Sequence, residues 1–170
     1  RILTVGRLTW KKGYEYALEA LSLLKGKQIN FEYRIVGEGD YREAILYAIH
    51  QLGLTDNVIL RGQLSPEKVK DEMEWADIYI QSSIQEGFCN AVLEAQAMGL
   101  LCIVTNADGL SENVLDGKTG WVVPKRSSEA IAEQIIKIKN MEMLQYNKIR
   151  KNAIVRVNDH FHLNEQIKNW

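Results

Sequence analysis

A basic pair follows the first apolar run of the sequence. Arg7 comes directly after Gly6, and Lys12 lies five residues beyond Arg7. A glycine at the end of a strand lets the backbone approach a ligand closely. A guanidinium forks onto phosphate oxygens and an ammonium adds a compact charge, so the pair is typical of a diphosphate site. Two solvated loop residues would give the same pattern.

The segment from Glu86 to Glu94 carries the most chemical information. An apolar run gives way there to a helix pattern, so free backbone N–H groups are expected at Gly87, Phe88, Cys89 and Asn90. Such groups at a helix N-terminus favour an anion. Because two carboxylates would repel phosphate, we expect Glu86 and Glu94 to bind neutral hydroxyls of a sugar and a ribose. An ordinary amphipathic helix with exposed glutamates is the alternative interpretation.

Two further loops could border the same site. Gly37 and Gly39 begin a dinucleotide fingerprint, but Arg42 stands where its third glycine belongs, which disfavours a nicotinamide-dependent oxidoreductase. A turn of close backbone approach, able to form a wall for a nucleotide, is the better interpretation. Residues 106–112 follow another apolar run and would line the cleft from the opposite side, or form a plain surface turn.

Histidines and cysteines give no pattern of metal ligands. His160 and His162 are two residues apart, a spacing that does not align them on a helix face, and His50 is isolated. Cys89 and Cys102 have no metal or redox spacing, which favours a reducing compartment. Cys89 has no neighbouring histidine in the sequence, so we expect a structural role for it rather than a nucleophilic one.

Short apolar runs alternate with amphipathic stretches and would position these residues. Strands are predicted at 2–5, 33–36, 58–60, 77–80, 100–104 and 121–123, with helices or helical turns between them and a polar helical tail. This alternation predicts parallel βαβ units, hence an α/β fold with a doubly wound, Rossmann-like parallel sheet of about six strands. Ligands of such sheets bind beyond the carboxyl ends of the strands, where the candidate residues lie.

Length and composition restrict the remaining possibilities. The 170 residues, 46% hydrophobic with a net charge of -1, fit one folded domain over 1–170 without general attraction for nucleic acid or an anionic membrane. No apolar run approaches the roughly 20 residues of a membrane span. The chain begins at Arg1 inside a strand-like run, so we expect a fragment of a longer protein.

Together, and in order, these motifs resemble the carboxyl-terminal domain of retaining glycosyltransferases of the GT-B fold, group 1 (family 4). The resemblance covers roughly residues 2–140. Its landmarks are Val5-Gly6-Arg7, Lys12-Gly13, the segments 36–39, 57–62 and 76–78, Ser82-Ser83, Glu86 and Glu94 separated by seven residues, and the segments 94–99 and 112–120.

The resemblance implies a role for each candidate residue. Arg7 and Lys12 would hold the diphosphate of the donor and offset the charge that develops as the nucleotide leaves, and Glu86 would bind hydroxyls of the donor sugar, which makes these three the expected catalytic residues. Glu94 would bind the ribose. Donor contacts would also come from Gly6, Gly37, Gly39, Gly87, Phe88, Cys89 and Asn90, with the backbone of 62–64 near the nucleobase. No bound metal or other cofactor is expected.

The sequence departs from the family pattern at several positions. The family commonly has glycine at Cys89 and Asp108, and both departures touch the expected cleft, so they could change which sugar fits. Proline is usual at Gln81 and Leu101, and methionine at Gln96. For these three departures, as packing or turn variants, we expect little functional consequence.

The resemblance also implies a partner domain. It predicts a hexose transferred from a nucleotide-diphosphate sugar to an acceptor glycan or lipid, with the acceptor held by an amino-terminal domain outside these residues. We expect a cytoplasmic enzyme, any contact with the inner face of the membrane being made by that domain, and weak donor binding without turnover by this fragment alone. A non-catalytic nucleotide-sugar binding module and a related GT-B epimerase or phosphorylase are the alternatives.

Overall fold

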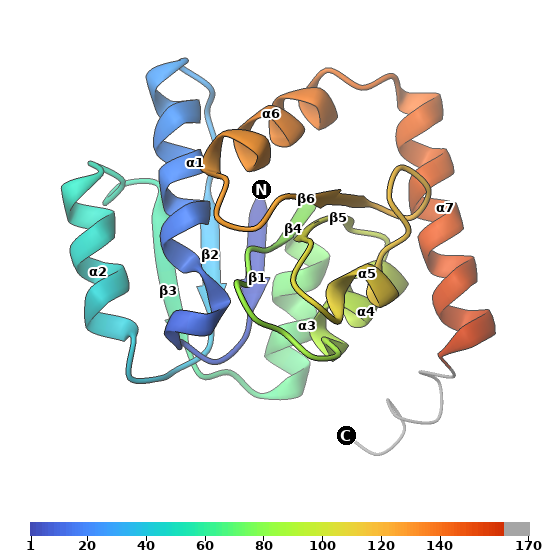
Figure 1. Cartoon of the computed structure of the whole chain (residues 1–170), viewed down its shortest axis with the longest axis horizontal. Helices are drawn as coiled ribbons and strands as arrows, with labels where there is room; N and C mark the ends of the chain where they lie inside the picture. The colour runs from blue at the N-terminus through green and yellow to red at the C-terminus, as the bar shows by residue number, and fades with distance from the viewer. Residues whose placement is uncertain (162–170) are drawn as a thin grey trace.

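One parallel sheet organises the computed structural model, which describes residues 1–161 (Figure 1). Its six strands run in the order β3-β2-β1-β4-β5-β6, and every neighbouring pair is parallel. The strands are β1 (Ile2–Val5), β2 (Tyr33–Val36), β3 (Val58–Gly62), β4 (Ile78–Gln81), β5 (Leu101–Thr105) and β6 (Trp121–Val123). The predicted doubly wound α/β sheet is therefore confirmed.

Helices connect the strands and follow the last of them. They are η1 (Trp10–Lys12), α1 (Tyr14–Gly26), α2 (Arg42–Gln51), α3 (Pro66–Trp75), α4 (Asn90–Ala97), α5 (Leu110–Asn113), α6 (Ser128–Lys139) and α7 (Met143–His160). Pro66 begins α3, where a missing N–H costs nothing. Ser127 caps α6, because its Oγ accepts a hydrogen bond from the N–H of Ala130. Within residues 1–161 no helix is long and apolar enough to cross a membrane.

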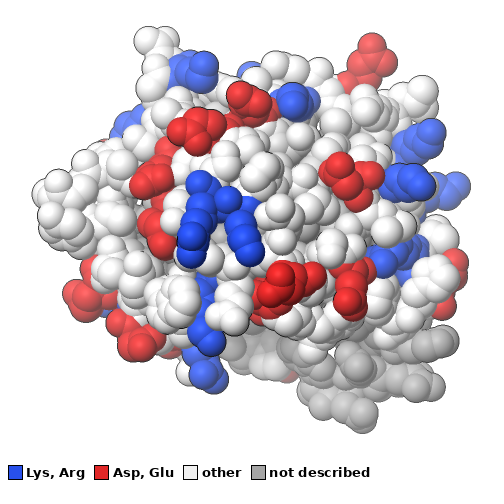
Figure 2. Space-filling model, in the orientation of Figure 1, with Lys and Arg blue, Asp and Glu red and all other residues white. Residues whose placement is uncertain are grey.

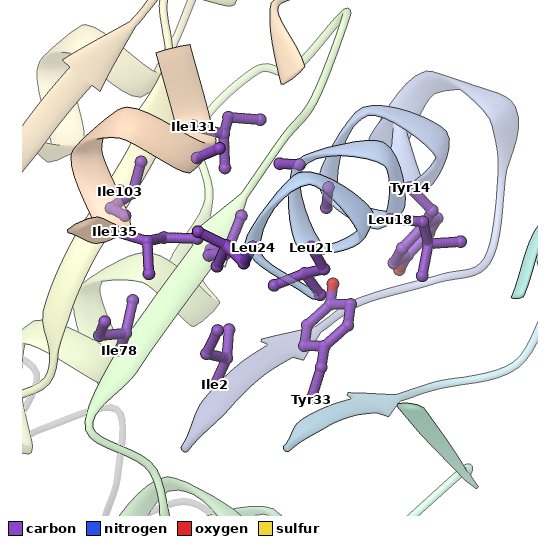
Figure 3. Close-up of a cluster of buried hydrophobic side chains, with 14 of the residues drawn as sticks. Ile2, Tyr14, Leu18, Leu21, Leu24, Tyr33, Ile78, Ile103, Ile131 and Ile135 are labelled. Carbon is purple, nitrogen blue, oxygen red and sulfur yellow. The ribbon is translucent and has the colours of Figure 1, made fainter. Parts of the chain in front are cut away.

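The first face of the sheet is covered by α1, α2 and α6. Figure 3 shows Leu21 and Leu24 of α1 above Ile2, with Ile131 and Ile135 of α6 beside Ile103. Successive strand residues point to opposite faces, so neighbours of these residues serve the other layer. This alternation within fully buried strands is what a parallel sheet with helices on both faces requires.

The second face is covered by α3, α4 and α5. Leu3, Tyr79 and Cys102 point to this side and pack against Met73 of α3 and Val92 of α4. The last helix, α7, lies outside α4 and contacts it where Leu93 and Val157 are both buried. On this face, α3, α4 and α5 pack directly against the strands, and α7 packs on the outer side of α4.

Helix α3 is held to the sheet by a buried carboxylate. Glu72 is 4% exposed and accepts hydrogen bonds from Arg34 of β2 at 3.1 Å and from Arg61 of β3 at 2.7 Å. The guanidinium of Arg34 also lies 3.7 Å from the centre of the Trp75 ring. These contacts fix the position of α3 against strands β2 and β3.

The chain reverses its direction of travel across the sheet between β1 and β4. From β1 the chain builds outward to β2 and β3, and β4 then returns to the other side of β1. The connections leaving these neighbouring strands separate to opposite faces, which opens a crevice at their carboxyl ends. Arg7 and Glu86 both follow strands at this point.

Candidate functional site

Two of the predicted catalytic residues form an ion pair at this reversal point. Nζ of Lys12, on the connection after β1, lies 2.5 Å from Oε2 of Glu86, on the connection after β4. Their side chains are only 17% and 13% exposed. Partial burial lowers the effective dielectric constant around the pair, which strengthens the attraction between the two charges relative to a fully solvated pair. A cation and a carboxylate are thus held together at the edge where ligands of such sheets bind.

Backbone contacts between the two connections place this pair. The carbonyl of Lys11 accepts a hydrogen bond from the N–H of Ile84 at 2.8 Å, and the hydroxyl of Ser82 donates to the carbonyl of Lys12 at 3.1 Å. Gly13 has a φ of 60°, and a Cβ there would lie 2.3 Å from the carbonyl oxygen of Ser82. Only glycine allows this approach, so the Lys12-Gly13 motif serves the geometry of Lys12.

Arg7 follows Gly6 directly after β1, at the same end of the sheet as the ion pair. Its side chain is exposed and forms no ion pair within residues 1–161. The hydroxyl of Tyr14 lies 3.2 Å from the carbonyl of Gly6 and 3.3 Å from that of Arg7, which steadies the backbone. A Cβ at Gly6 would lie 3.8 Å from Nζ of Lys12, so the ammonium of Lys12 lies close to the end of β1, where Arg7 follows in the sequence. Figure 2 shows Lys and Arg side chains near the middle of this face, bordered by acidic ones.

The turn after β2 packs against the turn after β1. A Cβ at Gly37 would lie 2.0 Å from the carbonyl oxygen of Gly6, and one at Gly39 would lie 2.2 Å from that of Leu8. The N–H of Leu8 donates to the carbonyl of Glu38 at 2.9 Å. The predicted turn of close approach is confirmed, and backbone contact within the protein accounts for both glycines.

The start of α4 departs from the expectation in one respect. Gly87, Phe88 and Asn90 are exposed, whereas Cys89 is 6% exposed and its N–H donates to Oδ1 of Asn113 at 3.1 Å. The prediction of a free N–H at Cys89 is therefore wrong, because α5 supplies an internal acceptor. Burial raises the pKa of the Cys89 thiol, which suits a structural role.

Asn113 is a residue that the sequence did not single out. Besides accepting from Cys89, its Nδ2 donates to the carbonyl of Cys89 at 3.3 Å, so one amide pairs with both backbone groups. Its side chain is fully buried. The residues between Leu110 and Val114 are all polar, so nothing in the sequence marked Asn113 as buried or identified its partner.

The loop after β5 lies directly against the loop that follows Glu86. The N–H of Gly109 donates to the carbonyl of Glu86 at 3.0 Å, and a Cβ at Gly109 would lie 1.7 Å from the carbonyl oxygen of Gly87. Asp108 beside it is exposed. The segment 106–112 thus meets the Glu86 loop, as one of the two sequence interpretations allowed.

Glu94 lies apart from the Lys12–Glu86 pair, in a cleft of about 290 Å³ between α3 and α4. The other residues that line this cleft are Pro66, Glu67, Val69, Lys70, Met73, Ala97 and Met98. The side chain of Glu94 has no hydrogen-bond partner among residues 1–161, and burial raises the pKa of its carboxyl. The two glutamates therefore have different surroundings: Glu86 pairs with Lys12, and Glu94 lines a largely apolar cleft.

The part of the chain that the structure describes contains no cluster of three or more His, Cys, Asp or Glu residues that could hold a metal ion. His50 lies in α2 and His160 ends α7, whereas His162 lies outside the described residues.

Comparison with known proteins identifies relatives. The family described as "Glycosyl transferases group 1" matches residues 1–156. The putative colanic acid biosynthesis glycosyltransferase WcaL of Escherichia coli is 32% identical over 174 residues, which cover 99% of this chain and 42% of the relative. The amylovoran biosynthesis glycosyltransferase AmsK of Erwinia amylovora is 34% identical over 148 residues, which cover 84% of this chain and 36% of the relative.

Two solved structures of glycosyltransferases have a fold similar to that of this chain. A glycosyltransferase of Rickettsia africae superposes with a TM-score of 0.87 at 30% identity, covering 99% of this chain and 45% of its own. The C-terminal domain of a group 1 glycosyl transferase of Francisella tularensis gives a TM-score of 0.82 at 24% identity, covering 94% of this chain and 85% of its own.

The length of the match matters for what these relatives imply. The chain spans 42% and 36% of the two curated relatives above, and the Francisella structure is a C-terminal domain by itself. The family match, in contrast, takes in nearly all of the chain, including both connections that carry Lys12 and Glu86. The chain belongs to the group 1 glycosyl transferase family.

Proposed function

We propose that this chain is the donor-binding domain of a retaining glycosyltransferase, which moves a hexose from a nucleotide-diphosphate sugar to an acceptor glycan or lipid. The observation that carries this proposal is the Lys12–Glu86 ion pair at the reversal point of the sheet, where the exposed Arg7 follows β1. A cation for phosphate and a carboxylate for hydroxyls thus lie in contact, and a sugar diphosphate presents both groups on adjacent atoms.

In this proposal the basic residues act on the leaving group. The bond between the anomeric carbon and the phosphate oxygen breaks, and that oxygen gains negative charge. Arg7 can bind two phosphate oxygens at once, and Lys12 supplies a positive charge that is already in place. Such preorganised charge stabilises the transition state because no rearrangement is needed during the reaction.

The two glutamates would recognise the neutral parts of the donor. Glu86 offers one carboxylate oxygen to the hydroxyls of the hexose. Glu94 would accept hydroxyls of the ribose, with the apolar cleft between α3 and α4 beside it for the nucleoside. In support of such a donor, HepE of Anabaena was solved in complex with UDP-glucose, and its fold matches this chain with a TM-score of 0.84 at 24% identity over 99% of this chain and 47% of its own.

The acceptor would be bound elsewhere in the whole protein. We assign it to an amino-terminal domain, because the curated relatives are more than twice as long as their matched portion. The names of WcaL and AmsK refer to colanic acid and amylovoran biosynthesis, which supports a role in polysaccharide biosynthesis, and we propose that the enzyme acts in the cytoplasm. The chemistry requires no bound metal, since Arg7 and Lys12 carry the charge that a metal would supply.

Calorimetric titration tests this proposal. The chain would be titrated with UDP, GDP, ADP and the glucose conjugate of each, alongside Arg7→Ala and Glu94→Ala. We expect one nucleotide to bind and each substitution to weaken it about tenfold or more, the usual loss for a charge-assisted hydrogen bond. Arg1→Ala is the matched control, because Arg1 is an exposed arginine paired with Asp77 at the opposite edge of the sheet.

Two outcomes would contradict the proposal. Failure of every nucleotide to bind at millimolar concentration would remove the donor site from this chain. Binding by a longer protein that includes the amino-terminal part, without transfer of the sugar to any acceptor or to water, would favour a non-catalytic binding module.

A further inference from the structure

Gln81 ends β4 with a fully buried side chain that touches four polar groups. Its Oε1 lies 3.1 Å from the hydroxyl of Tyr79 and 3.7 Å from Sγ of Cys89. Its Nε2 lies 2.8 Å from Oγ of Ser83 and 3.4 Å from Oε2 of Glu86. The sequence treats Gln81 as a packing or turn variant, whereas in the structure its amide contacts Glu86.

The chemistry of these neighbours fixes the orientation of the amide. Burial raises the pKa of the Tyr79 hydroxyl and of the Cys89 thiol, so both carry hydrogens and face the amide oxygen. The amide nitrogen faces a hydroxyl oxygen and a carboxylate oxygen, which accept. The single hydrogen of the Tyr79 hydroxyl is shared between the amide oxygen of Gln81 and the carbonyl of Val5 at 3.0 Å, and the hydroxyl oxygen accepts the N–H of Val5 at 3.3 Å. The amide therefore connects β1 and β4 to the site.

The same contacts divide the two oxygens of Glu86. Oε2 accepts from Lys12, from the hydroxyl of Ser83 at 2.9 Å, and from Gln81. Ser83 can direct its single proton to Glu86 because its oxygen already accepts the N–H of Gln81. Oε1 has no hydrogen-bond partner within residues 1–161 and is not among the buried unpaired atoms, so it is open to a ligand.

We propose that Gln81 is a positioning residue for donor recognition: it fixes Glu86, directly and through Ser83, so that Oε1 faces the hexose. This inference rests on the proposed donor site and adds a determinant of sugar recognition to it. Gln81 contacts Glu86, the proposed ligand of the hexose, and not Lys12 or Arg7, so we expect its contribution to appear only when the donor carries a sugar.

Affinity measured with and without the sugar isolates this contribution. UDP and UDP-glucose, or the corresponding pair of whichever nucleotide binds, would be titrated into the chain and into Gln81→Met. This substitution keeps the length of the side chain and removes both polar groups. We expect about a tenfold loss of affinity for the sugar conjugate, with the affinity for the bare nucleotide changed less than about twofold.

Two further variants test whether Gln81 acts through Glu86. In a Glu86→Gln background, Gln81→Met is expected to cause no additional loss, because the group that it positions is already altered. Gln134→Met is the matched control, a buried glutamine of α6 on the other face of the sheet, and should leave both affinities unchanged. Gln81→Asn, which keeps an amide but is one methylene shorter, replaces Met if that variant fails to fold, and circular dichroism checks each variant.

Equal losses for nucleotide and sugar conjugate, or no loss for either, would overturn the role of Gln81. A full additional loss in the Glu86→Gln background would overturn the route through Glu86. Failure of the unsubstituted chain to bind either ligand would instead overturn the proposed function, so the two failures are distinguishable.

Discussion

The side chain of Asn113 pairs with the backbone of Cys89 through both halves of its amide. Oδ1 of Asn113 accepts the N–H of Cys89 at 3.1 Å, and Nδ2 donates to the carbonyl of Cys89 at 3.3 Å. The carbonyl of Asn113 in turn accepts from Gln96 at 2.9 Å and from Arg156 at 2.8 Å. The loop that leads into α4 is thus held by one residue of α5, which is itself held by α4 and α7.

Asn113→Ala is expected to destabilise the chain strongly. It would leave the N–H of Cys89 buried without a partner, which costs about 1–3 kcal/mol, and would leave a cavity in place of the buried amide. We expect the free energy of unfolding to fall by about 2–4 kcal/mol in urea denaturation. Asn152→Ala is the control, since its amide donates to Lys118 at the exposed surface and should cost less than about 0.5 kcal/mol. Equal losses would show that the pairing has no special weight.

Substitution by alanine should destabilise the chain at Gly109 but not at Gly87. A Cβ at Gly109 would lie 1.7 Å from the carbonyl oxygen of Gly87, whereas a Cβ at Gly87 would have nothing within 4 Å. Gly109→Ala must therefore displace the Glu86 loop, and we expect a loss of about 2 kcal/mol in stability together with weaker nucleotide binding. Gly87→Ala should leave the melting temperature nearly unchanged. Thermal unfolding of both variants checks the contrast, and similar melting temperatures would contradict the packing described for these loops.

Substitutions at Lys12 and Glu86 can distinguish the contribution of this ion pair to stability from its contribution to binding. Lys12→Met leaves a carboxylate that is 13% exposed without its cation, which should cost about 1–3 kcal/mol. Lys12→Met with Glu86→Gln removes both charges, so we expect most of that stability to return. Nucleotide-sugar binding should stay lost in the double variant, because both proposed ligand contacts are gone. A double-mutant cycle in urea measures the effect on stability, and titration measures the effect on binding. If the double variant were as unstable as Lys12→Met, the loss of stability would not come from leaving Glu86 unpaired.

Glu94 should make stability depend on pH. Burial raises the pKa of its carboxyl, so the folded chain holds this proton more tightly than the unfolded chain. Stability therefore falls as pH rises from the ordinary carboxyl pKa through the raised one, and the ionised carboxylate costs stability at pH 7. Glu94→Gln should raise the melting temperature at pH 7 and lose that advantage toward pH 4, while weakening nucleotide binding. The exposed Glu133→Gln serves as control, and a gain independent of pH would contradict the assignment to the carboxylate.

The sheet could be predicted from the sequence largely because strands β1, β2, β4 and β5 are mostly buried on both faces. Continuous apolar runs such as 100–104, which follows Gly99 and precedes polar residues, predicted every strand to within two residues. The order in which the strands pair was not predicted beyond the doubly wound pattern. Apolar runs have similar composition throughout the sheet, and nothing in them specifies a neighbour.

The site was predictable only where strand ends determine position. Parallel strands place their carboxyl ends at one edge, which is why Lys12 and Glu86, far apart in sequence, could be assigned to one site. The contacts of Gln81 and Asn113 could not be found in this way. They depend on loop geometry and on the direction of single side chains, and neither residue type has a local pattern that reveals its partner.

Helix α7 has a consequence for where a self-sufficient donor domain ends. The sheet is complete at Val123, but Nη2 and Nη1 of Arg156 hold the carbonyls of Glu112 and Asn113 at 2.6 and 2.8 Å, behind the loop that carries Cys89. A protein shortened after β6 or α6 would keep every strand and every proposed ligand contact, yet lose the outermost restraint on that loop. The smallest unit that retains the site's geometry therefore extends at least to Arg156.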